Sequence, residues 1–458
     1  MNLNPKIFKA YDIRGIYPSE INEETAELIA QTYLKFLSER IKKPISQLKI
    51  TVGQDNRQAS RPLANKFIET LLQYGVTVDN LGLISVNDLY FAVGHYQYDG
   101  GVMATASHNP PEYGGFKMVL LNPDFSDSIE FINGQALYQK LQSLEFPLSD
   151  EQLPGIIKDK DISQDHLNHI LSFVDIKKIK PLKVVVDTGN GTMTILIPKL
   201  FEKLPCQLIH LFPELDGRFP NRPANPLTLG AADKIRRKVL EEKADVGVIY
   251  DVDGDRMFLV DEQGKFIRGD MILLLLAKEL LKKTPGAGIV YNLICSHAVP
   301  ELVAKWGGKP IRSEVGYRNL AEHMRKENGI LSGEVSAHFA FKNNFYADSG
   351  FIALVLVLEA ISEDSRKLSE IIKEYNLYAR GDEINIEVDD IKAELEKIRK
   401  HYKGNIRDEI DGITVEFNDW WFNVRPSNTE PLLRVTVEAK NQEELKKRQE
   451  EILNIIEK

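Results

Sequence analysis

The strongest constraint on the fold of this chain is the repeated alternation of short apolar runs with helical patterns. Residues 48–53 form such a run, and after a polar loop the pattern becomes helical over residues 62–74. Similar runs recur at residues 182–186, 244–250 and 289–293. Strands that alternate with helices form βαβ units, and their largely parallel sheets are buried on both faces. The sequence therefore predicts an α/β fold.

Three of these segments share a local plan, and they read LKITVGQDN from Leu48, LKVVVDTGN from Leu182 and AGIVYNLIC from Ala287. Each is an apolar strand with polar residues at or soon after its end, which predicts three related α/β units. After about residue 370 apolar and polar residues alternate as in half-exposed strands, and an amphipathic helix over 442–456 follows. We expect a small α+β domain there, built on an antiparallel meander.

The charge balance argues against one class of function. The chain of 458 residues has 58 Lys and Arg against 67 Asp and Glu, which gives a net charge of −9. Proteins that bind nucleic acids carry basic patches, so we expect no nucleic-acid partner. At roughly 100–200 residues per domain, the length predicts three or four domains.

We expect a cytoplasmic protein that does not enter a membrane. The polar N-terminal stretch lacks the apolar run of a signal peptide. No uninterrupted apolar stretch reaches the length of about 18 residues that a membrane span needs. Cys206 and Cys295 show no C-x-x-C spacing, and we expect two buried thiols in a reducing compartment.

The segment TASHNPP from Thr105 stands at the end of an apolar run. Its two prolines prevent regular continuation and hold a loop open. Ser107, beside His108, can therefore be an exposed nucleophile whose hydroxyl carries a transferred group. A hydrogen-bonded turn is the alternative interpretation.

The segment DVDGDR from Asp251 follows another apolar strand and has carboxylates at alternate positions, namely Asp251, Asp253 and Asp255. Oxygen ligands of this kind suit Mg²⁺ or Mn²⁺, with phosphate oxygens as further ligands. An EF-hand loop is excluded because Arg256 stands where that loop needs glycine, and because a strand precedes it. Solvated loop aspartates are the alternative.

Two further motifs offer groups that bind phosphates or sugars. RPSNT from Arg425 supplies a guanidinium, two hydroxyls and an amide, which suit a phosphate, although Pro-Ser-Asn is also ordinary turn chemistry. Glu334 and Ser336 lie on one side of an extended stretch and could grip sugar hydroxyls. Arg14 and Lys117 add positive charge, although each alone would be read as a solvated surface residue.

Six motifs stand in order between residues 8 and 431: FKAYDIRG from Phe8, TASHNP from Thr105, GGFK from Gly114, DVDGDR from Asp251, GEVSAH from Gly333 and RPSNTEP from Arg425. Together they resemble the α-D-phosphohexomutase family, and most closely its phosphomannomutase/phosphoglucomutase branch. The resemblance implies four domains around a central cleft: three related α/β domains with mixed sheets and a smaller C-terminal α+β domain. The expected ranges are 1–150 with the phosphoserine loop, 151–257 with the metal-binding loop, 258–370 with the sugar-binding loop, and 371–458 with the phosphate-binding loop.

The resemblance also implies the reaction, which interconverts hexose 1-phosphate and hexose 6-phosphate, with mannose or glucose as the sugar. Ser107 as phosphoserine would donate its phosphoryl group, and a hexose 1,6-bisphosphate would be both intermediate and activator. One Mg²⁺ per chain would lie on Ser107, Asp251, Asp253 and Asp255. Arg14, His108 and Lys117 would assist proton transfer and charge stabilisation.

By the same match the partners are small hexose phosphates, and the chain would be a monomer or weak homodimer. The substrate-binding residues would be Tyr11, Arg256, Tyr317, Glu334, Ser336, Arg425, Ser427, Asn428 and Thr429.

Three positions depart from the family pattern. Val252 stands where glycine is usual, which we expect to stiffen the metal loop without removing a ligand. Val86 and Asn87 replace Thr-Pro, with an effect expected on packing, and Tyr317 replaces a histidine that contacts the sugar phosphate. Phosphoglucosamine mutase is an alternative against which Asn428 argues. A catalytically weak sugar-phosphate-binding relative and a Mg²⁺-dependent phosphatase are the others.

Overall fold

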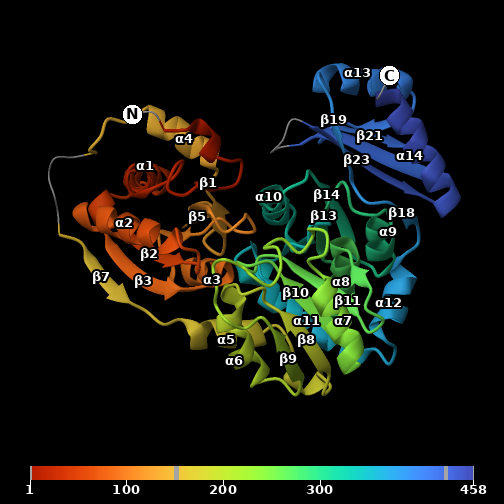
Figure 1. The fold of residues 1–458 in the computed structure, drawn as a ribbon, viewed down its shortest axis with the longest axis horizontal. Coiled ribbons are helices and arrows are strands. Elements are labelled where there is room, and N and C mark those ends of the chain that lie inside the picture. The colour runs from red at the N-terminus through yellow and green to blue at the C-terminus, as the bar shows by residue number, and fades with distance from the viewer. Residues whose placement is uncertain (1–2, 149–153, 428–431, 457–458) are drawn as a thin grey trace. The chain divides into compact units, whose positions relative to one another are not determined.

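The computed structural model describes residues 3–148, 154–427 and 432–456. The chain divides into two compact units, which we describe separately. Unit 1 consists of residues 1–268 and 338–369, and unit 2 consists of residues 269–337 and 370–458. Figure 1 shows the ribbon and labels many of the elements of both units.

The first sheet of unit 1 is mixed. Its strands lie in the order β1 (Ile13–Ile16), β5 (Tyr113–Leu121), β4 (Gly100–Ala104), β2 (Lys49–Gln54), β3 (Thr77–Leu83) and β7 (Ile156–Asp159), and β6 (Ile129–Phe131) pairs with β5. β2 is parallel to β3 and β4, whereas β5 is antiparallel to β1, β4 and β6. The helices are α1 (Glu23–Ile41), α2 (Ser60–Gln73), α3 (Val86–Tyr96) and α4 (Gly134–Gln142). Both α2 and α3 contact β2 and β4, which explains why these strands are almost wholly buried.

The second sheet of unit 1 is also mixed. Its strands lie in the order β12 (Phe266–Ile267), β11 (Met257–Asp261), β10 (Val246–Tyr250), β8 (Lys183–Asp187) and β9 (Gln207–Leu211). The helices of this part are α5 (Ser163–Leu171), α6 (Ile197–Phe201), α7 (Asp233–Glu242) and α11 (Gly350–Glu363). The hairpin of β16 (Phe339–Phe341) and β17 (Ala347–Asp348) completes the unit. The expected domain boundary after residue 257 falls inside β11, which pairs with β10 along its whole length.

Unit 2 begins with a parallel arrangement of three strands, in which β13 (Gly288–Asn292) lies between β14 (Lys309–Ser313) and β15 (Gly329–Gly333). The helices around it are α8 (Gly269–Lys283), α9 (Ala298–Lys305) and α10 (Tyr317–Glu327). The chain re-enters unit 2 within α12 (Leu368–Tyr375).

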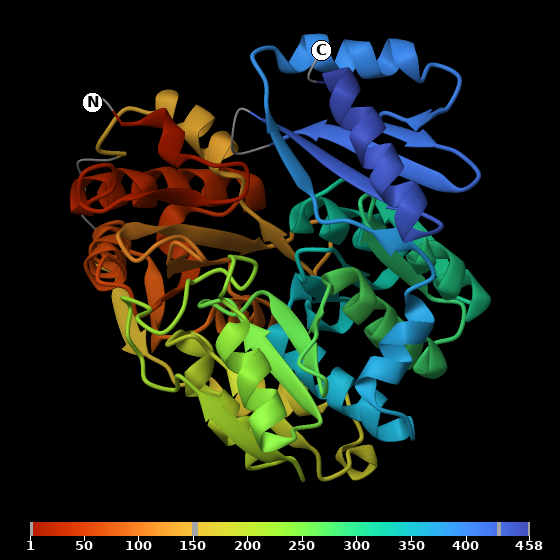
Figure 2. The ribbon, with the colours of Figure 1, turned by 45° about the vertical axis from the view of Figure 1, so that its right-hand side comes forward.

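The C-terminal part of unit 2 is an antiparallel sheet with two helices. Its strands lie in the order β18 (Ala379–Arg380), β23 (Leu432–Ala439), β22 (Trp420–Pro426), β21 (Ile413–Glu416) and β20 (Ile406–Asp408), and β19 (Ile384–Glu387) pairs with β23. Figure 2 shows α13 (Ile391–His401) and α14 (Gln442–Ile456) against this sheet, and the two helices contact each other. The predicted meander and terminal helix are confirmed.

One strand arrangement occurs three times. β2, β8 and β13 each lie between two parallel neighbours. One neighbour is the next strand in the chain (β3, β9 or β14), and the other is the strand after that (β4, β10 or β15). These central strands lie in the three segments with a shared local plan. The motifs at Thr105, Asp251 and Glu334 follow β4, β10 and β15, so they leave equivalent strands.

Two smaller expectations differ from the structure. The residues after 191 have a helical pattern up to residue 204, which predicts one helix, but they form a 3-10 turn, Thr192–Ile195, and the short α6, since Pro198 fits only a helix start. Other 3-10 turns are Pro5–Ile7, Ile45–Gln47, Ile176–Lys178 and Lys342–Asn344. Cys295 is buried, but Cys206 is only partly so. Among the described residues, no helix is both long and apolar enough to cross a membrane.

Candidate active site

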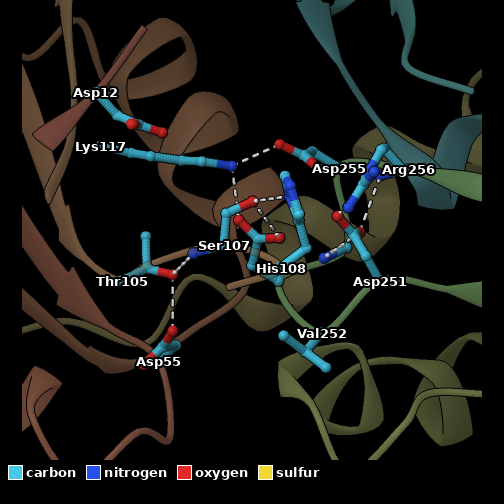
Figure 3. Close-up of polar contacts among 12 residues, drawn as sticks. Asp12, Asp55, Thr105, Ser107, His108, Lys117, Asp251, Val252, Asp255 and Arg256 are labelled. Atoms are coloured by element: carbon cyan, nitrogen blue, oxygen red, sulfur yellow. Dashed lines mark hydrogen bonds and ion pairs between the residues drawn. The ribbon is translucent and has the colours of Figure 1, made fainter. Parts of the chain in front are cut away.

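Ser107 leaves the carboxyl end of β4 in an unusual backbone conformation, with φ +51°. Its N–H donates to Thr105 Oγ1 at 2.9 Å. Its Oγ lies 3.2 Å from Asp253 Oδ1 and 3.2 Å from His108 Nδ1 (Figure 3). The expectation of an exposed hydroxyl is wrong, because Ser107 is only 2% exposed. The structure places the hydroxyl directly against the acidic motif.

Asp251, Asp253 and Asp255 converge after β10, as the alternating spacing predicts. One oxygen from each lies within 4.8 Å of the others, and all three residues are buried. Asp251 Oδ1 also accepts from the N–H groups of Gly254 and Arg256, which curls the loop around it. The alternative of solvated loop aspartates is therefore wrong.

Lys117 lies on β5, where it pairs with Met103 of β4, four residues before Ser107. Its Nζ bonds Asp253 Oδ2 at 2.6 Å and Asp255 Oδ2 at 2.5 Å. The side chain is 5% exposed. Lys117 is thus a buried counter-charge of the acidic cluster and not a solvated surface residue.

The charges of the cluster are strongly coupled. Burial, followed by the charge of Asp255, raises the pKa of Asp251 to about 7. Burial also acts to raise the pKa of Asp255, but Lys117 and His338 outweigh it and hold that pKa well below its usual range. Burial, then the charges of Arg256 and Arg14, hold the pKa of His108 well below its usual range. His108 is therefore neutral near pH 7.

The donor set fits a small hard cation. Three buried carboxylates at this separation carry more negative charge than the single ammonium group of Lys117 offsets, and oxygen ligands are those that Mg²⁺ prefers. Arg256 Nε bonds Asp251 Oδ2 at 2.8 Å, and its buried Nη2 has no hydrogen-bond partner among the described residues. That free N–H could serve a phosphate oxygen.

Arg14 lies on β1, at the edge of the first sheet. It donates to Asp12 Oδ2 at 2.8 and 2.5 Å and to Asn109 Oδ1 at 2.7 Å. Asn109 belongs to the same loop as Ser107, so Arg14 contacts the nucleophile loop directly. Tyr11 precedes β1 and is half-buried.

The replacements at Val252 and Asn87 are both explained. Val252 is buried with Phe219 and Ala224, and Figure 3 shows it turned away from the carboxylates. Asn87 does more than alter packing, because its Nδ2 donates to Gly254 O at 2.8 Å and its Oδ1 accepts from Gly350 N at 2.9 Å. Asn87 therefore braces the metal loop from α3.

In unit 2, the motif after β15 forms a compact loop. Glu334 is 3% exposed, and its two oxygens accept from Ser336 Oγ at 2.5 Å and from Asn292 Nδ2 at 3.1 Å. Gly269, at the start of α8, lies beneath this loop, where a Cβ would stand 2.4 Å from Glu334 O. Sequence reasoning missed Asn292, although it is the polar residue that ends the strand of the third similar segment.

Arg425 on β22 is buried, and its Nη2 bonds Glu383 Oε2 at 3.0 Å. Its Nε is buried and has no hydrogen-bond partner among the described residues. Ser427 N donates to Leu432 O at 2.9 Å. Asn428 and Thr429 lie outside the described residues. Tyr317 is half-buried at the first turn of α10.

Comparison with known proteins identifies the family. Models of the phosphoglucomutase/phosphomannomutase alpha/beta/alpha domains I, II and III match residues 5–131, 164–264 and 268–378. The model of the C-terminal domain of phosphoglucomutase/phosphomannomutase matches residues 383–455.

Similar whole proteins agree with this match. A phosphomannomutase of Methanocaldococcus jannaschii is 38% identical over 99% of this chain and 98% of its own length. A phosphomannomutase of Escherichia coli K12 is 35% identical over 94% of each chain. The crystal structure of a phosphoglucomutase/phosphomannomutase family protein from Burkholderia thailandensis superposes with a TM-score of 0.87, at 28% identity over 99% of this chain and 98% of that one. The chain therefore belongs to the phosphoglucomutase/phosphomannomutase family of intramolecular phosphotransferases, and it has four domains of α/β architecture.

Proposed function

We propose that this enzyme interconverts hexose 1-phosphates and hexose 6-phosphates through a phosphorylated Ser107. One observation carries the proposal: Ser107 Oγ lies 3.2 Å from a carboxylate of the buried acidic cluster. A hydroxyl beside a cation site of this kind is suited to phosphoryl transfer, in which charge neutralisation is the main requirement.

In the proposed reaction a sugar hydroxyl attacks the phosphorus of phosphoserine. The bond from phosphorus to the new sugar oxygen forms, the bond to Ser107 Oγ breaks, and the product is a hexose 1,6-bisphosphate. Transfer of its other phosphoryl group back to Ser107 completes the cycle. Mg²⁺ held by Asp251, Asp253 and Asp255 would supply charge neutralisation at the transferring group.

The chain's own residues supply the remaining chemistry. His108 would take up the proton that the attacking hydroxyl releases, since its Nδ1 lies 3.2 Å from Ser107 Oγ, where the phosphoryl group is transferred. Lys117, Arg14 and Arg256 would offset the charge of the phosphoryl oxygens.

We assign substrate recognition mainly to unit 2. Glu334 and Ser336 would bind sugar hydroxyls. Ser336 donates to one oxygen of the Glu334 carboxylate and Asn292 donates to the other, so the carboxylate is held in place. The remaining substrate contacts proposed are Tyr11, Tyr317, Arg425, Ser427, Asn428 and Thr429. The substrates proposed are mannose and glucose phosphates, with the bisphosphate as activator.

The four domain ranges also remain a proposal. Because β11 and β12 belong to the sheet of β10, we propose to place the boundary between the second and third domains near residue 268 instead of 257. The other boundaries, near residues 150 and 370, are kept.

Ser107→Ala tests the central claim. Wild-type protein incubated with glucose 1,6-bisphosphate and Mg²⁺ should gain one phosphoryl group by intact mass, and the variant should gain none and lose mutase activity. Full mutase activity in the variant would contradict the proposal. Stoichiometric release of inorganic phosphate by the wild type would instead indicate a phosphatase.

A comparison of kcat/KM on the 1-phosphates of mannose, glucose and glucosamine tests the sugar. We expect the first two to be preferred. A marked preference for glucosamine 1-phosphate would favour the phosphoglucosamine mutase alternative.

A further inference from the structure

Two buried Asp–Arg pairs lie at equivalent places in unit 1. Asp55 directly follows β2 and Asp187 ends β8, and each of these strands lies between two parallel neighbours in its sheet. Arg57 pairs with Asp55, and Arg222 pairs with Asp187, at Nε–O distances of 3.2 and 2.8 Å. Both guanidinium groups are at most 2% exposed. Neither pair has a part in the reaction proposed above.

The first pair, Asp55 and Arg57, is hydrogen-bonded to the loop that carries Ser107. Arg57 donates to the carbonyl oxygens of Ser107, Asn109 and Pro110, the last two at 2.7 and 2.6 Å. Asp55 accepts from Thr105 Oγ1 at 2.7 Å, and Thr105 Oγ1 accepts from Ser107 N–H at 2.9 Å. Figure 3 shows this line from Asp55 through Thr105 to Ser107.

The pair thus fixes both peptide groups of Ser107, one through Thr105 and the other directly. This matters because Ser107 has a φ of +51°, a conformation that a residue with a side chain adopts only when its surroundings enforce it. The same conformation directs Oγ toward Asp253. Loss of the pair would let the loop relax and would move the hydroxyl.

The second pair, Asp187 and Arg222, is hydrogen-bonded to the backbone just before the metal loop, residues 251–256. Arg222 Nη2 donates to Tyr250 O at 2.5 Å, and Tyr250 is the residue before Asp251. Asp187 Oδ1 accepts both Arg222 Nε and Gly189 N–H, each at 2.8 Å. Gly189 has a φ of +58°, and a Cβ on it would lie 2.6 Å from the guanidinium. The backbone at Gly189 therefore packs tightly against the guanidinium of Arg222.

We propose that Arg57 and Arg222 are positioning residues with separate tasks: Arg57 orients the hydroxyl of Ser107, and Arg222 orients the first carboxylate of the metal loop. The kinetic part of this inference rests on the proposed function, whereas the structural part does not.

Arg57→Lys and Arg222→Lys form a matched pair of variants, because each keeps its charge and loses the planar fork of donors. Hydrogen exchange followed by mass spectrometry tests the structural part. Arg57→Lys should accelerate exchange in peptides covering residues 105–110 and leave those covering 251–256 unchanged. Arg222→Lys should show the reverse. Equal acceleration of both peptides in both variants, or of neither, would overturn the separation of tasks.

Two functional measurements follow on the same proteins. Single-turnover phosphorylation of Ser107 by saturating glucose 1,6-bisphosphate should slow about ten- to a hundredfold in Arg57→Lys, the range for loss of a charge-assisted hydrogen bond. Its Kd for Mn²⁺, measured by electron paramagnetic resonance, should stay within about twofold of the wild type. In Arg222→Lys the Kd for Mn²⁺ should rise about tenfold or more. Losses that simply follow the fall in Tm would contradict a positioning role.

Thr105→Val is the second route if Arg57→Lys fails to fold, because it removes the hydroxyl between Asp55 and Ser107 at nearly constant volume. It should slow phosphorylation without weakening Mn²⁺ binding, and an unchanged rate would contradict the proposal. If wild-type protein accepts no phosphoryl group, the proposed function fails, while hydrogen exchange and Mn²⁺ binding still decide the roles of both arginines.

Discussion

At the residue scale, Lys117 stabilises the acidic cluster of Asp251, Asp253 and Asp255. Its ammonium group bonds two of three carboxylates that would otherwise repel one another in a buried site. The third, Asp251, is bonded by Arg256. Each carboxylate therefore has a fixed partner, and the loop is preorganised before any cation binds.

Replacement of Asp253 by Asn should weaken cation binding. The amide keeps the shape but removes the charge, and its oxygen is a poorer ligand, so we expect the Kd for Mg²⁺ to rise about tenfold or more. Mutase activity should fall in parallel. Isothermal titration of Mg²⁺ into the variant and the wild type measures the difference.

Asp261→Asn is the matched control, because Asp261 is a buried carboxylate of the same unit that caps the turn after β11. It should leave the Kd for Mg²⁺ unchanged. Wild-type activity that survives thorough chelation with EDTA would contradict a metal-dependent mechanism.

The residues that we propose to touch the reacting groups could be predicted because they lie in short motifs. Ser107 and the three aspartates need no knowledge of the fold beyond a strand followed by a loop. Asp55 and Arg57 act on Ser107 from about fifty positions away, and only the parallel pairing of β2 with β4 brings them together. Nothing local in the sequence distinguishes them from other polar residues at a strand end.

At the element scale, the contact between α3 and α5 should make the protein acid-sensitive. His169 on α5 lies against Phe91 and Phe345, and its Nε2 bonds Asn344 Oδ1 at 3.0 Å. Burial lowers the pKa of His169 to about 4. Below pH 6.5 the unfolded chain binds a proton that the folded chain refuses, so stability falls as the pH drops from about 6.5 toward 4.

His169→Gln should reduce this sensitivity, because the amide can still bond Asn344 but does not titrate. At pH 5 the free energy of unfolding of the wild type should be about 2 kcal/mol lower than at neutral pH because of His169, and the variant should avoid this loss. Thermal unfolding at pH 7.5 and pH 5 measures it as a smaller drop in Tm. His401→Gln removes an exposed histidine and should leave the drop unchanged. An equal drop in all three proteins would refute the assignment.

The start of α8 should control the sugar loop. In Gly269→Ala the new Cβ would stand 2.4 Å from Glu334 O and 2.7 Å from Val335 O, so the loop backbone must shift. We expect KM for hexose phosphates to rise roughly tenfold, which corresponds to about 1.4 kcal/mol. Steady-state kinetics checks it, with Gly404→Ala as a control in open space. An unchanged KM would show that the loop tolerates the displacement.

Strand positions were predictable to within a residue or two where an apolar run ends at a polar loop. At β3 the sequence shows only a short β-branched run, residues 76–78, as a strand signal. The strand is longer, because its later residues, including Asp79 and Asn80, pair with β2 and β7 and are only half-buried. Their pattern carries no clear period, since a strand near a sheet edge does not need one.

At the scale of the whole molecule, the proposed reaction requires the enzyme to bind its substrate in two orientations. Either phosphate of the sugar must be held away from Ser107 while the other reacts. We propose Arg425 for this task because its guanidinium is a permanently charged fork of donors; its present partner is Glu383, which also contacts Arg434. A phosphate would compete with this carboxylate for the guanidinium.

Arg425→Ala should lower kcat/KM by roughly one to two powers of ten in both reaction directions, because a charge-assisted hydrogen bond contributes about 1.5–3 kcal/mol. Arg399→Ala is the control. It removes an arginine of α13 that pairs with Glu396 and Glu409, and it should change kcat/KM little. Kinetics from the 1-phosphate and from the 6-phosphate test this. A loss in only one direction would indicate separate phosphate sites.

The four-domain architecture was predictable from the order of six motifs, whereas the division into two units was not. Unit 1 includes residues 338–369, which form the C-terminal end of the expected third domain. α11 explains this, because Tyr250 and Asn87 of unit 1 bond Gly350 at its start. The apolar sequence of a helix such as α11 indicates that the helix is buried, but it does not indicate which part of the chain the helix packs against.

The three equivalent loops all leave the carboxyl ends of β4, β10 and β15, which leaves the opposite ends of the strands for other uses. Gly286, in the turn before β13, has a φ of +80° and stands in open space. The five residues of β13 separate it from Asn292 by on the order of 15 Å. A fluorescent label or an affinity tag inserted there would thus be carried at a distance from the loop of Glu334, and the enzyme could be immobilised by this turn with its catalytic rate unchanged.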